Sequence, residues 1–337
     1  MKRRDVVALL GVTALGVVAL GAAAAAWRLA GEAQQRPPVI GYLSSASVAS
    51  DSSPVPTAFR MGLNQKGLVP GQNVIIETRQ ADGHYEKLPA LAADLIHIPV
   101  KVIVAAGGSP SARAAMAATK TIPVLFIAGY DPVKLGFVSS FNRPGSNATG
   151  VSIYTTELLA KRLQLLREVV PRTSRIALLV NADNAGSEIE VGDMAAVAEA
   201  AGLALIPVKA SVATGLEAAF ATAVAERADA LLVSADPFFS TKRNSIVALA
   251  ARHALPTAYP WHEYVESGGL MSYGPSLMDA YYQIGIYAGR IIHGERVGDL
   301  PVQLPLKFDL GVNLRTAKAL NLTVPRVTLM AADPVIE

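Results

Sequence analysis

Short apolar runs alternate with amphipathic helical patterns along most of this sequence, and no other feature constrains its fold as strongly. A short apolar run indicates a buried strand, and apolar residues spaced three and four apart indicate a helix. Such alternation is typical of βα units, in which helices cover both faces of a parallel sheet. The sequence therefore predicts an α/β fold. The expected strands are residues 39–43, 74–76, 102–104, 124–127, 176–180, 203–208, 230–233, 256–259 and 306–312, and the expected helices are residues 54–66, 88–96, 111–120, 158–169, 185–201, 216–226, 246–253, 277–292 and 314–320.

The alternation begins afresh after a loop-rich stretch at residues 144–150, which reads Pro-Gly-Ser-Asn-Ala-Thr-Gly. The chain has 337 residues, of which 51% are hydrophobic, so it can build two hydrophobic cores. Two similar βα series joined by a bridge predict two doubly wound, Rossmann-like lobes.

Residues 1–33 have the pattern of a secretory signal peptide and are not expected to belong to the fold. Lys2-Arg3-Arg4 forms a positive start, residues 6–26 carry no charge, and Gly31-Glu32-Ala33 offers small residues to a signal peptidase. The apolar run is long enough to cross a bilayer, so an uncleaved anchor is the alternative. The paired arginines also permit export by the twin-arginine route.

The balance of charge and the absence of cysteine exclude several classes of function. Thirty basic and 27 acidic residues give a net charge of +3, scattered along the chain, whereas nucleic-acid binders concentrate basic charge on one face. With no cysteine, the chain has no disulfide, thiolate metal site, cysteine nucleophile or lipid-modified cysteine. Export without a lipid-anchoring cysteine fits a Gram-negative periplasm.

Three predicted strands end in a polar residue that stands directly before proline: Ser109-Pro110, Asp131-Pro132 and Asp236-Pro237. This is the pattern of a helix N-cap followed by proline at the first helical position. Free amides there would face the carboxyl edge of the sheet, where open α/β sheets bind ligands, and would favour an anion. The alternative is that these are ordinary caps. Gly107-Gly108 would let a ligand approach the backbone closely, although neither a phosphate loop nor a Rossmann glycine fingerprint is present.

Aromatic residues gather near the predicted strand ends, where a stack of rings would suit a planar or apolar ligand. For any single ring, packing in the core is the competing interpretation. Three further tyrosines lie on the helix expected at 277–292, and we expect them to serve packing or the surface. The strand-end rings are Tyr42, Tyr130, Tyr154, Phe238, Tyr259, Trp261 and Tyr273, and the helix tyrosines are Tyr281, Tyr282 and Tyr287.

Catalytic and metal-binding patterns are poorly supported. The five histidines are scattered, with no His-Glu-x-x-His spacing, and no Gly-x-Ser-x-Gly elbow occurs. Asp131 and Asp236 could form an acid and base pair, but one of them is better explained as the counter-ion of a ligand ammonium group. We therefore expect neither an enzyme nor a cofactor.

Six segments carry a resemblance to a known family. They are residues 38–44 (Pro-Val-Ile-Gly-Tyr-Leu-Ser), 121–124 (Thr-Ile-Pro-Val), 131–136 (Asp-Pro-Val-Lys-Leu-Gly), 141–151 (Phe-Asn-Arg-Pro-Gly-Ser-Asn-Ala-Thr-Gly-Val), 268–274 (Gly-Gly-Leu-Met-Ser-Tyr-Gly) and 313–320 (Asn-Leu-Arg-Thr-Ala-Lys-Ala-Leu). On these segments the chain resembles the substrate-binding proteins of ABC transporters, in the TrpX-like family with the type I periplasmic binding-protein fold.

The resemblance implies two lobes that hold a small solute between them and pass it unaltered to an inner-membrane permease powered by a cytoplasmic ATPase. Some relatives bind aromatic or other amino acids. We expect a periplasmic monomer whose first lobe comprises residues 37–150 and 272–300 and whose second comprises 151–271 and 301–337. The crossings would then fall near Gly150, Gly269 and Pro301, and closure would be a hinge motion.

The predicted ligand site combines hydroxyls, helix amides, a carboxylate and rings from the strand-end loops. Hydroxyls would come from the first loop, a carboxylate would bind at the 107–111 turn, and an aspartate would pair with an ammonium group. The rival readings are a ligand-sensing module docked to a membrane receptor and a periplasmic enzyme that uses the two aspartates. The candidate residues are Ser44, Ser45, Ser47, Gly108, Ser109, Ser111, Asp131, Tyr154, Asp236, Phe238 and Trp261.

Overall fold

The computed structural model describes residues 36–46, 54–153 and 157–337. Residues from Val39 onward form one compact unit. The predicted leader at 1–33 lies outside the described residues, as do Ser47 and Tyr154. In the part of the chain that is described, no helix combines the length and the apolar content needed to cross a bilayer.

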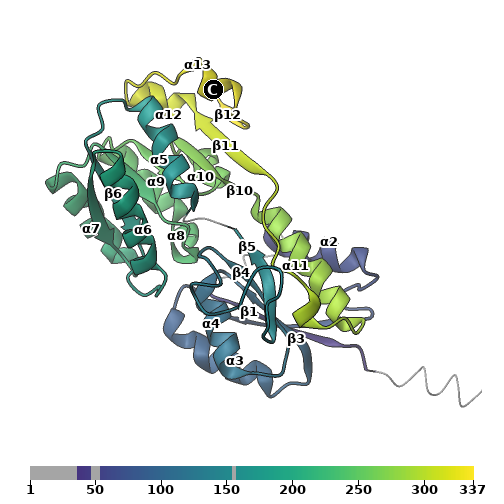
Figure 1. Cartoon of the computed structure of the whole chain (residues 1–337). Helices are drawn as coiled ribbons and strands as arrows, with labels where there is room; N and C mark the ends of the chain where they lie inside the picture. Colours follow the sequence, from purple (N-terminus) through teal and green to yellow (C-terminus); the bar gives the residue numbers. More distant parts are fainter. Residues whose placement is uncertain (1–35, 47–53, 154–156) are drawn as a thin grey trace, which may run out of the picture. The chain divides into compact units, whose positions relative to one another are not determined.

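The first sheet has five parallel strands in the order β2-β1-β3-β4-β5, seen among the blue and teal segments in Figure 1. Its side chains alternate between two apolar layers, as the two-residue period of a strand requires: Val102 and Val104 contact one cluster, and Ile103 and Ala105 the other. The strands are β1 (Val39–Ser44), β2 (Ile75–Gln80), β3 (Val100–Ala106), β4 (Val124–Ala128) and β5 (Ala148–Ser152).

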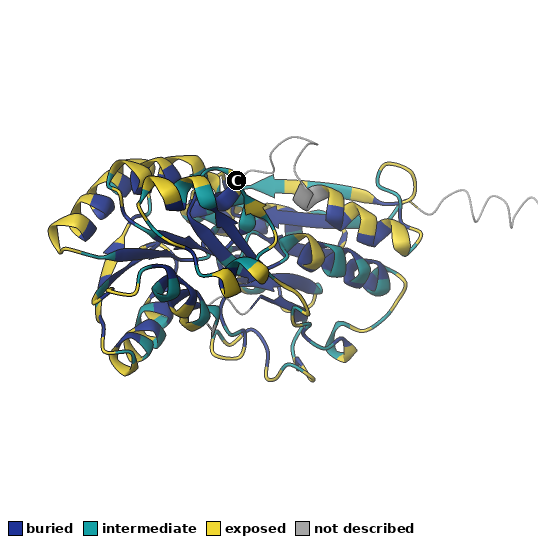
Figure 2. Cartoon of the chain, turned by 90° about the horizontal axis from the view of Figure 1, so that it is seen from above, coloured by how far each residue is buried: buried dark blue, intermediate teal, exposed yellow. Residues whose placement is uncertain are grey.

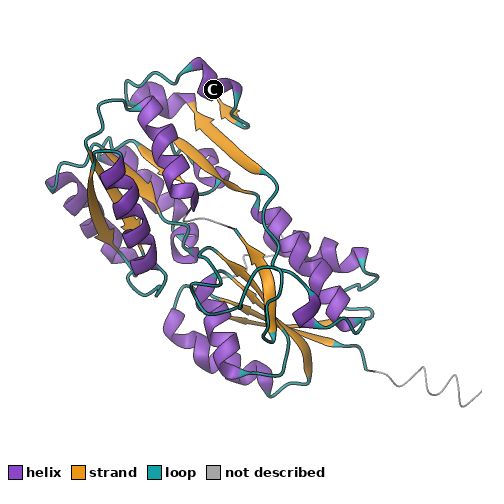
Figure 3. Cartoon of the chain, viewed as in Figure 1, coloured by secondary structure: helices purple, strands orange, loops and turns teal. Residues whose placement is uncertain are grey.

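Helices cover both faces of this sheet, which explains why its strands are apolar on both sides (Figure 3). The helices are α2 (Pro54–Gln65) and α11 (Leu277–Ile292) on one face, and α3 (Leu88–Ile96) and α4 (Ser109–Ala118) on the other, with the 3₁₀ turns η1 (Tyr85–Lys87) and η2 (Val297–Asp299).

Two glycines bring α2 and α11 into backbone contact. A Cβ on Gly62 would lie 2.1 Å from the Tyr282 carbonyl oxygen, and one on Gly285 would lie 2.3 Å from the Phe59 carbonyl oxygen. The helices therefore pack closely only because neither position bears a side chain, and α11 is held against the sheet although it is distant in sequence.

The second sheet has seven strands in the order β12-β11-β10-β9-β8-β6-β7. All described pairings are parallel except the one between β10 and β11. The strands are β6 (Arg175–Val180), β7 (Ala204–Lys209), β8 (Ala230–Val233), β9 (Thr257–Tyr259), β10 (Met271–Pro275), β11 (Phe308–Asn313) and β12 (Val335–Ile336).

Helices again lie on both faces of the second sheet, with buried strands between them in Figure 2. One face carries α5 (Glu157–Val169), α6 (Ser187–Ala200) and α12 (Leu314–Ala319); the other carries α7 (Ala213–Ala225), α9 (Arg243–Arg252) and α10 (His262–Glu266). The remaining helices are the short α8 (Pro237–Thr241) and α13 (Arg326–Met330).

The structure moves all three predicted crossings between the sheets. Residues 148–152 form a buried strand of the first sheet and not a loop; Gly150 pairs with Phe126 so closely that a Cβ on it would lie 2.0 Å from the Phe126 carbonyl oxygen. β10 pairs within the second sheet, so the chain returns after Pro275 and not at Gly269. Gln303 exchanges backbone hydrogen bonds of 2.8 and 2.9 Å with Gly150 and Ser152, so the last crossing follows Gln303 and not Pro301.

A candidate ligand cavity between the two sheets

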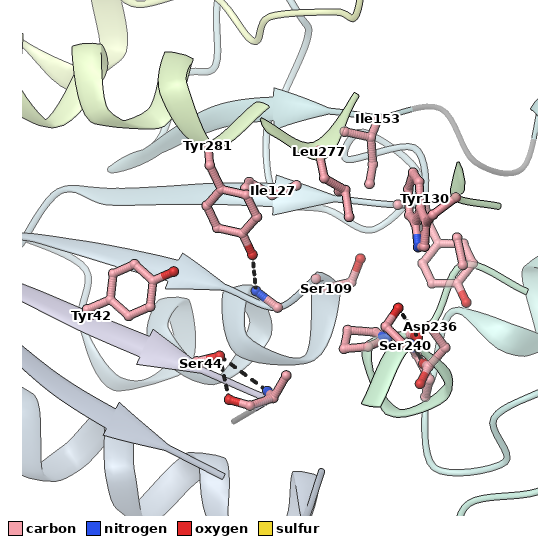
Figure 4. A pocket seen from close by; sticks show the side chains of 18 residues that line it. Tyr42, Ser44, Ser109, Ile127, Tyr130, Ile153, Asp236, Ser240, Leu277 and Tyr281 are labelled. Atoms are coloured by element: carbon pink, nitrogen blue, oxygen red, sulfur yellow. Dashed lines mark hydrogen bonds between the residues drawn. The ribbon is translucent and has the colours of Figure 1, made fainter. Parts of the chain in front are cut away.

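A cavity of about 170 Å³ lies where the loops at the strand ends of both sheets meet (Figure 4). Its size suits one small metabolite, since drug-sized ligands occupy roughly 300–1,000 Å³. The position agrees with the rule that open α/β sheets bind ligands at the carboxyl ends of their strands. Its lining residues are Tyr42, Ser44, Ala46, Gly107, Gly108, Ser109, Ile127, Gly129, Tyr130, Ile153, Asn184, Ala235, Asp236, Pro237, Ser240, Trp261, Leu277 and Tyr281.

The N-terminus of α4 faces this cavity with a spare hydroxyl. The helix begins at Ser109, so Gly108 is the N-cap and Ser109 is not, contrary to the sequence prediction. Ser109 is 4% exposed, and its buried hydroxyl has no hydrogen-bond partner among the described residues. Because the first amides of a helix carry partial positive charge, this end of α4 is suited to a carboxylate.

Glycine is required in the turn before α4. Gly107 and Gly108 have φ values of 77° and 85°, which L side chains rarely adopt. A Cβ on Gly107 would also lie 2.5 Å from the Ser45 Oγ. Ser45 donates a hydrogen bond to the Gly107 carbonyl, so it holds the turn and does not line the cavity, whereas Ser44 does line it.

Asp236 supplies the negative charge of the cavity. It is the N-cap of α8, as predicted, with Oδ1 accepting from the Phe238 amide at 2.9 Å. Oδ1 also accepts from the Tyr85 hydroxyl at 2.8 Å and from the Asn181 Nδ2 at 2.9 Å, while Oδ2 accepts from the Asn184 Nδ2 at 2.7 Å. Burial raises the pKa of Asp236, and these donors oppose that rise by favouring the carboxylate. Oδ2 therefore retains a lone pair for a ligand cation.

A second buried carboxylate lies behind the cavity wall. Glu190 of α6 accepts a hydrogen bond from the Tyr130 hydroxyl at 3.2 Å and another from the Ser234 hydroxyl. Burial raises the pKa of Glu190 to about 7, although its donors and the Arg162 charge favour ionisation. Arg162 is itself buried, donates to the Val233 carbonyl oxygen at 3.0 Å, and has its pKa lowered to about 10 by burial.

Rings and aliphatic side chains form the rest of the wall. Tyr42 and Tyr281 lie at one end of the view in Figure 4, and Ile127, Ile153 and Leu277 lie above Ser109. Tyr281 packs in the core, as expected, and it also lines the cavity, where its hydroxyl accepts from the Gly107 amide at 3.4 Å. Sequence patterns could not reveal this, since α11 reaches the site through its packing on α2 and on the first sheet, both distant in sequence.

Five of the sequence candidates line the cavity together: Ser44, Gly108, Ser109, Asp236 and Trp261. Four others lie outside its wall. Ser45 holds the Gly107 turn, and Ser111 is buried in α4. Asp131 accepts hydrogen bonds from the amides of Val133 and Lys134, in a turn that does not continue as a helix. Phe238 packs on Phe239, with 5.5 Å between the ring centroids.

Three polar residues near Asp236 escaped the sequence analysis: Tyr85, Asn181 and Asn184. The Asn181-Ala-Asp-Asn184 stretch directly follows the strand at 176–180, so the strand-end rule could have identified two of them. Tyr85 lies five residues after the end of β2, but the strand predicted from the sequence ends at residue 76, so the rule did not identify Tyr85. Two strand-end rings instead pack elsewhere, Tyr259 on Tyr264 and Tyr273 on Phe308.

No group of three or more acidic or histidine side chains suited to a metal ion occurs in the described ranges.

A family model described as "ABC transporter substrate binding protein" matches residues 54–336. The chain belongs to this family. Like its relatives, this substrate-binding protein has the type I periplasmic binding-protein fold, with two α/β sheets and a cavity between them.

Relatives of this substrate-binding protein include proteins that bind aromatic amino acids. It is 27% identical over 264 residues to a tyrosine-binding protein of Clostridioides difficile, covering 78% of this chain and 75% of that protein. A domain from Streptococcus pneumoniae in complex with L-Trp has a TM-score of 0.81 and 23% identity, covering 89% of this chain and all of that one. A Clostridium difficile substrate-binding protein with adhesive properties, in its ligand-free, open structure, has a TM-score of 0.62 and 26% identity, covering 86% of this chain and 96% of that one.

Proposed function

We propose that this protein binds a free amino acid, with an aromatic side chain favoured, as the solute-binding component of an ABC import system, and releases it chemically unchanged. The observation that carries the proposal is that one small cavity is lined both by groups that suit a carboxylate and by a group that suits an ammonium ion. The Ser109 hydroxyl and the α4 amides suit a carboxylate, and the Asp236 Oδ2 suits an ammonium group. A zwitterion of amino-acid size satisfies both.

The apolar part of the wall supports an aromatic side chain on that amino acid. Tyr42, Trp261 and Tyr281 offer ring faces and edges, and Ile127 and Leu277 add aliphatic surface. The tyrosine-binding and L-Trp-bound relatives support the same class of ligand.

The hydrogen bonds of Asp236 support binding rather than catalysis. A general acid or base must exchange a proton with its substrate, yet this carboxylate is held by donors from Tyr85, Asn181 and Asn184. Asp131, its suggested partner in an acid and base pair, does not line the cavity. Turnover of the bound amino acid by the purified protein would contradict the proposal.

Two lobes hinged by the three crossings would let a solute enter and leave. We place one lobe on the five-stranded sheet and the other on the seven-stranded sheet, with crossings after β5, after β10 and after Gln303. Export to the periplasm by a cleaved leader, delivery to a permease with its cytoplasmic ATPase, and a monomeric state belong to the same proposal. Loss of uptake of the amino acid in a deletion strain would separate import from sensing.

Isothermal titration calorimetry with L-tyrosine and L-tryptophan tests the ligand class directly. We expect micromolar affinity for at least one of them. Tyramine lacks the carboxylate, and 3-(4-hydroxyphenyl)propionate lacks the ammonium group. Each should bind at least about tenfold more weakly than the amino acid, because it leaves one polar group of the cavity without its charged partner. Equal affinity for the amino acids and for the two compounds that lack a charged group would contradict the proposed contacts with the carboxylate and the ammonium group. The absence of binding heat with every amino acid would contradict the proposed class of ligand.

A further inference from the structure

Tyr130 connects the two sheets at the cavity wall. It follows β4 of the first sheet, but its hydroxyl bonds Glu190 of α6, which covers the second sheet. The ring is buried and lines the cavity, whereas Glu190 and Ser234 do not line it. Burial and the Glu190 charge raise the pKa of Tyr130 well above its ordinary value, so the phenol stays protonated and acts as the donor. The contact can form only when the two sheets approach each other.

A missing side chain makes room for this ring. An ideal Cβ on Gly186 would lie 2.2 Å from the Tyr130 Cε2 and 2.3 Å from its Cδ2. Gly186 has φ −76° and ψ −15°, an ordinary right-handed helical conformation, so its backbone does not require glycine. The steric need for glycine here therefore comes from Tyr130.

The side chains around the Tyr130 hydroxyl are polar and fully buried. Ser234 donates to the Oε2 of Glu190, the oxygen that also accepts from Tyr130. The other Glu190 oxygen has no hydrogen-bond partner among the described residues. The charges that act on Glu190 are those of Arg162, which favours the carboxylate, and of Asp236, which opposes it. Withdrawal of Tyr130 would remove one of the two donors to a buried carboxylate, and unpaired buried carboxylates are costly.

We propose that Gly186, Glu190 and Ser234 form a socket for Tyr130, and that docking of Tyr130 in this socket couples an occupied cavity to the closed arrangement of the two sheets. This inference rests on the proposed function, because it assumes a solute that contacts the cavity face of Tyr130. Glu190 acts as a positioning residue: it holds the ring at the cavity wall without touching the solute.

Spin-label distance measurements can test the socket on the full chain, because the protein has no cysteine of its own. Ala117→Cys on α4 and Ala196→Cys on α6 are both exposed and place one label beside each sheet. Gly186→Ala fills the socket. Gly192→Ala is the matched control in the same helix, because nothing lies within 4 Å of its Cβ. The probes are L-tyrosine and L-tryptophan.

A short distance between the two labels reports the closed arrangement of the sheets. We expect the probes to produce this short distance in the wild type and in Gly192→Ala. In Gly186→Ala the short distance should not appear, and the Kd for the probes should rise at least about tenfold. Adding Tyr130→Ala to Gly186→Ala should recover only part of the short-distance population, because the clash is gone but the socket is empty, and affinity should stay reduced. Circular dichroism melts check that each variant folds. A short-distance population as large in the double variant as in the wild type would show that closure does not need Tyr130, and one no larger than in Gly186→Ala would show that Gly186→Ala acts by another route; either outcome would overturn the socket.

The socket and the ligand class can fail separately. If neither probe binds the wild type, the proposed class of ligand, an aromatic amino acid, is wrong. The socket is then tested by comparing the fraction of closed molecules in the wild type and in Gly186→Ala without any probe. A lower closed fraction in Gly186→Ala than in the wild type supports it. Equal closed fractions in the two proteins overturn it.

Discussion

The Tyr85 hydroxyl donates a 2.8 Å hydrogen bond to the Asp236 Oδ1, although the two residues stand 151 positions apart. It also accepts from the Phe238 amide at 3.2 Å. Tyr85 belongs to η1 beside the first sheet and Asp236 caps α8 at the end of a strand of the second, so this pair, like Tyr130 and Glu190, connects elements of the two sheets.

Tyr85→Phe should weaken ligand binding about tenfold or more, since a hydrogen bond to a charged group contributes about 1.5–3 kcal/mol. The expected cause is a less stable closed form, so calorimetry should show a higher Kd while the melting temperature without ligand changes little. Tyr282→Phe is the matched control, because that hydroxyl bonds Gln65 at an exposed position. Equal Kd values for the two variants would contradict a role for Tyr85 in closure.

Asp236→Asn should lower affinity for the amino acid by about ten- to a hundredfold, because it removes the charge that pairs with the ammonium group. Tyramine binding should fall as well, whereas 3-(4-hydroxyphenyl)propionate should lose little. Asp131→Asn is the control, since this half-buried carboxylate caps a turn outside the cavity. A comparable loss in both variants would indicate a general effect of charge and not a specific contact.

Ser109→Ala should weaken binding about fivefold or more without lowering stability, because the hydroxyl has no partner to lose within the described protein. Ser111→Ala removes a second buried, unpartnered hydroxyl from the same helix, but one that does not line the cavity. Calorimetry and thermal melts of the pair distinguish a ligand contact from a change in helix packing. An unchanged Kd for Ser109→Ala would remove Ser109 from the site.

The stability of the folded protein should fall as pH rises through the range set by Glu190. Burial raises its pKa from an ordinary 4.5 to about 7, so the folded state binds more protons than the unfolded state between those values. The stabilisation is fully present below the unfolded pKa and is lost as pH rises through the folded one. Melting temperatures from about pH 4.5 to 8 should decline more steeply in the wild type than in Glu190→Gln. Parallel curves would show that Glu190 does not titrate in this range.

Gly285→Ala should destabilise the protein by about 1–3 kcal/mol, because its Cβ would overlap the backbone of α2. A loss of this size lowers the melting temperature by about 1.5–5 °C in a protein of this length. Gly298→Ala is the control, since no atom lies within 4 Å of its Cβ. Because α11 carries Tyr281 to the cavity, weaker ligand binding should accompany the lower stability. A melting temperature equal to that of the control would contradict close packing of α2 and α11.

The sequence alone determined the α/β class and most of the elements, because apolar periodicity reflects local burial on a strand or a helix face. The helix at 277–292 and the N-cap at Asp236 match the structure. The strand-end rule also brought Ser44, Ser109 and Asp236 to one cavity, since the carboxyl ends of parallel strands share an edge.

Only the tertiary structure decided which residues meet from distant parts of the chain. Tyr281 reaches the cavity through the packing of α11 on α2, and Tyr85 through a hydrogen bond to the other sheet. The crossing after β10 depended on strand pairing, which residues 271–275 do not encode locally. Gly186 shows the same limit: its backbone is ordinary, and the need for glycine there appears only when Tyr130 of the facing sheet lies against it. Local patterns record what a residue does within its own element, whereas a contact between elements depends on how they pack.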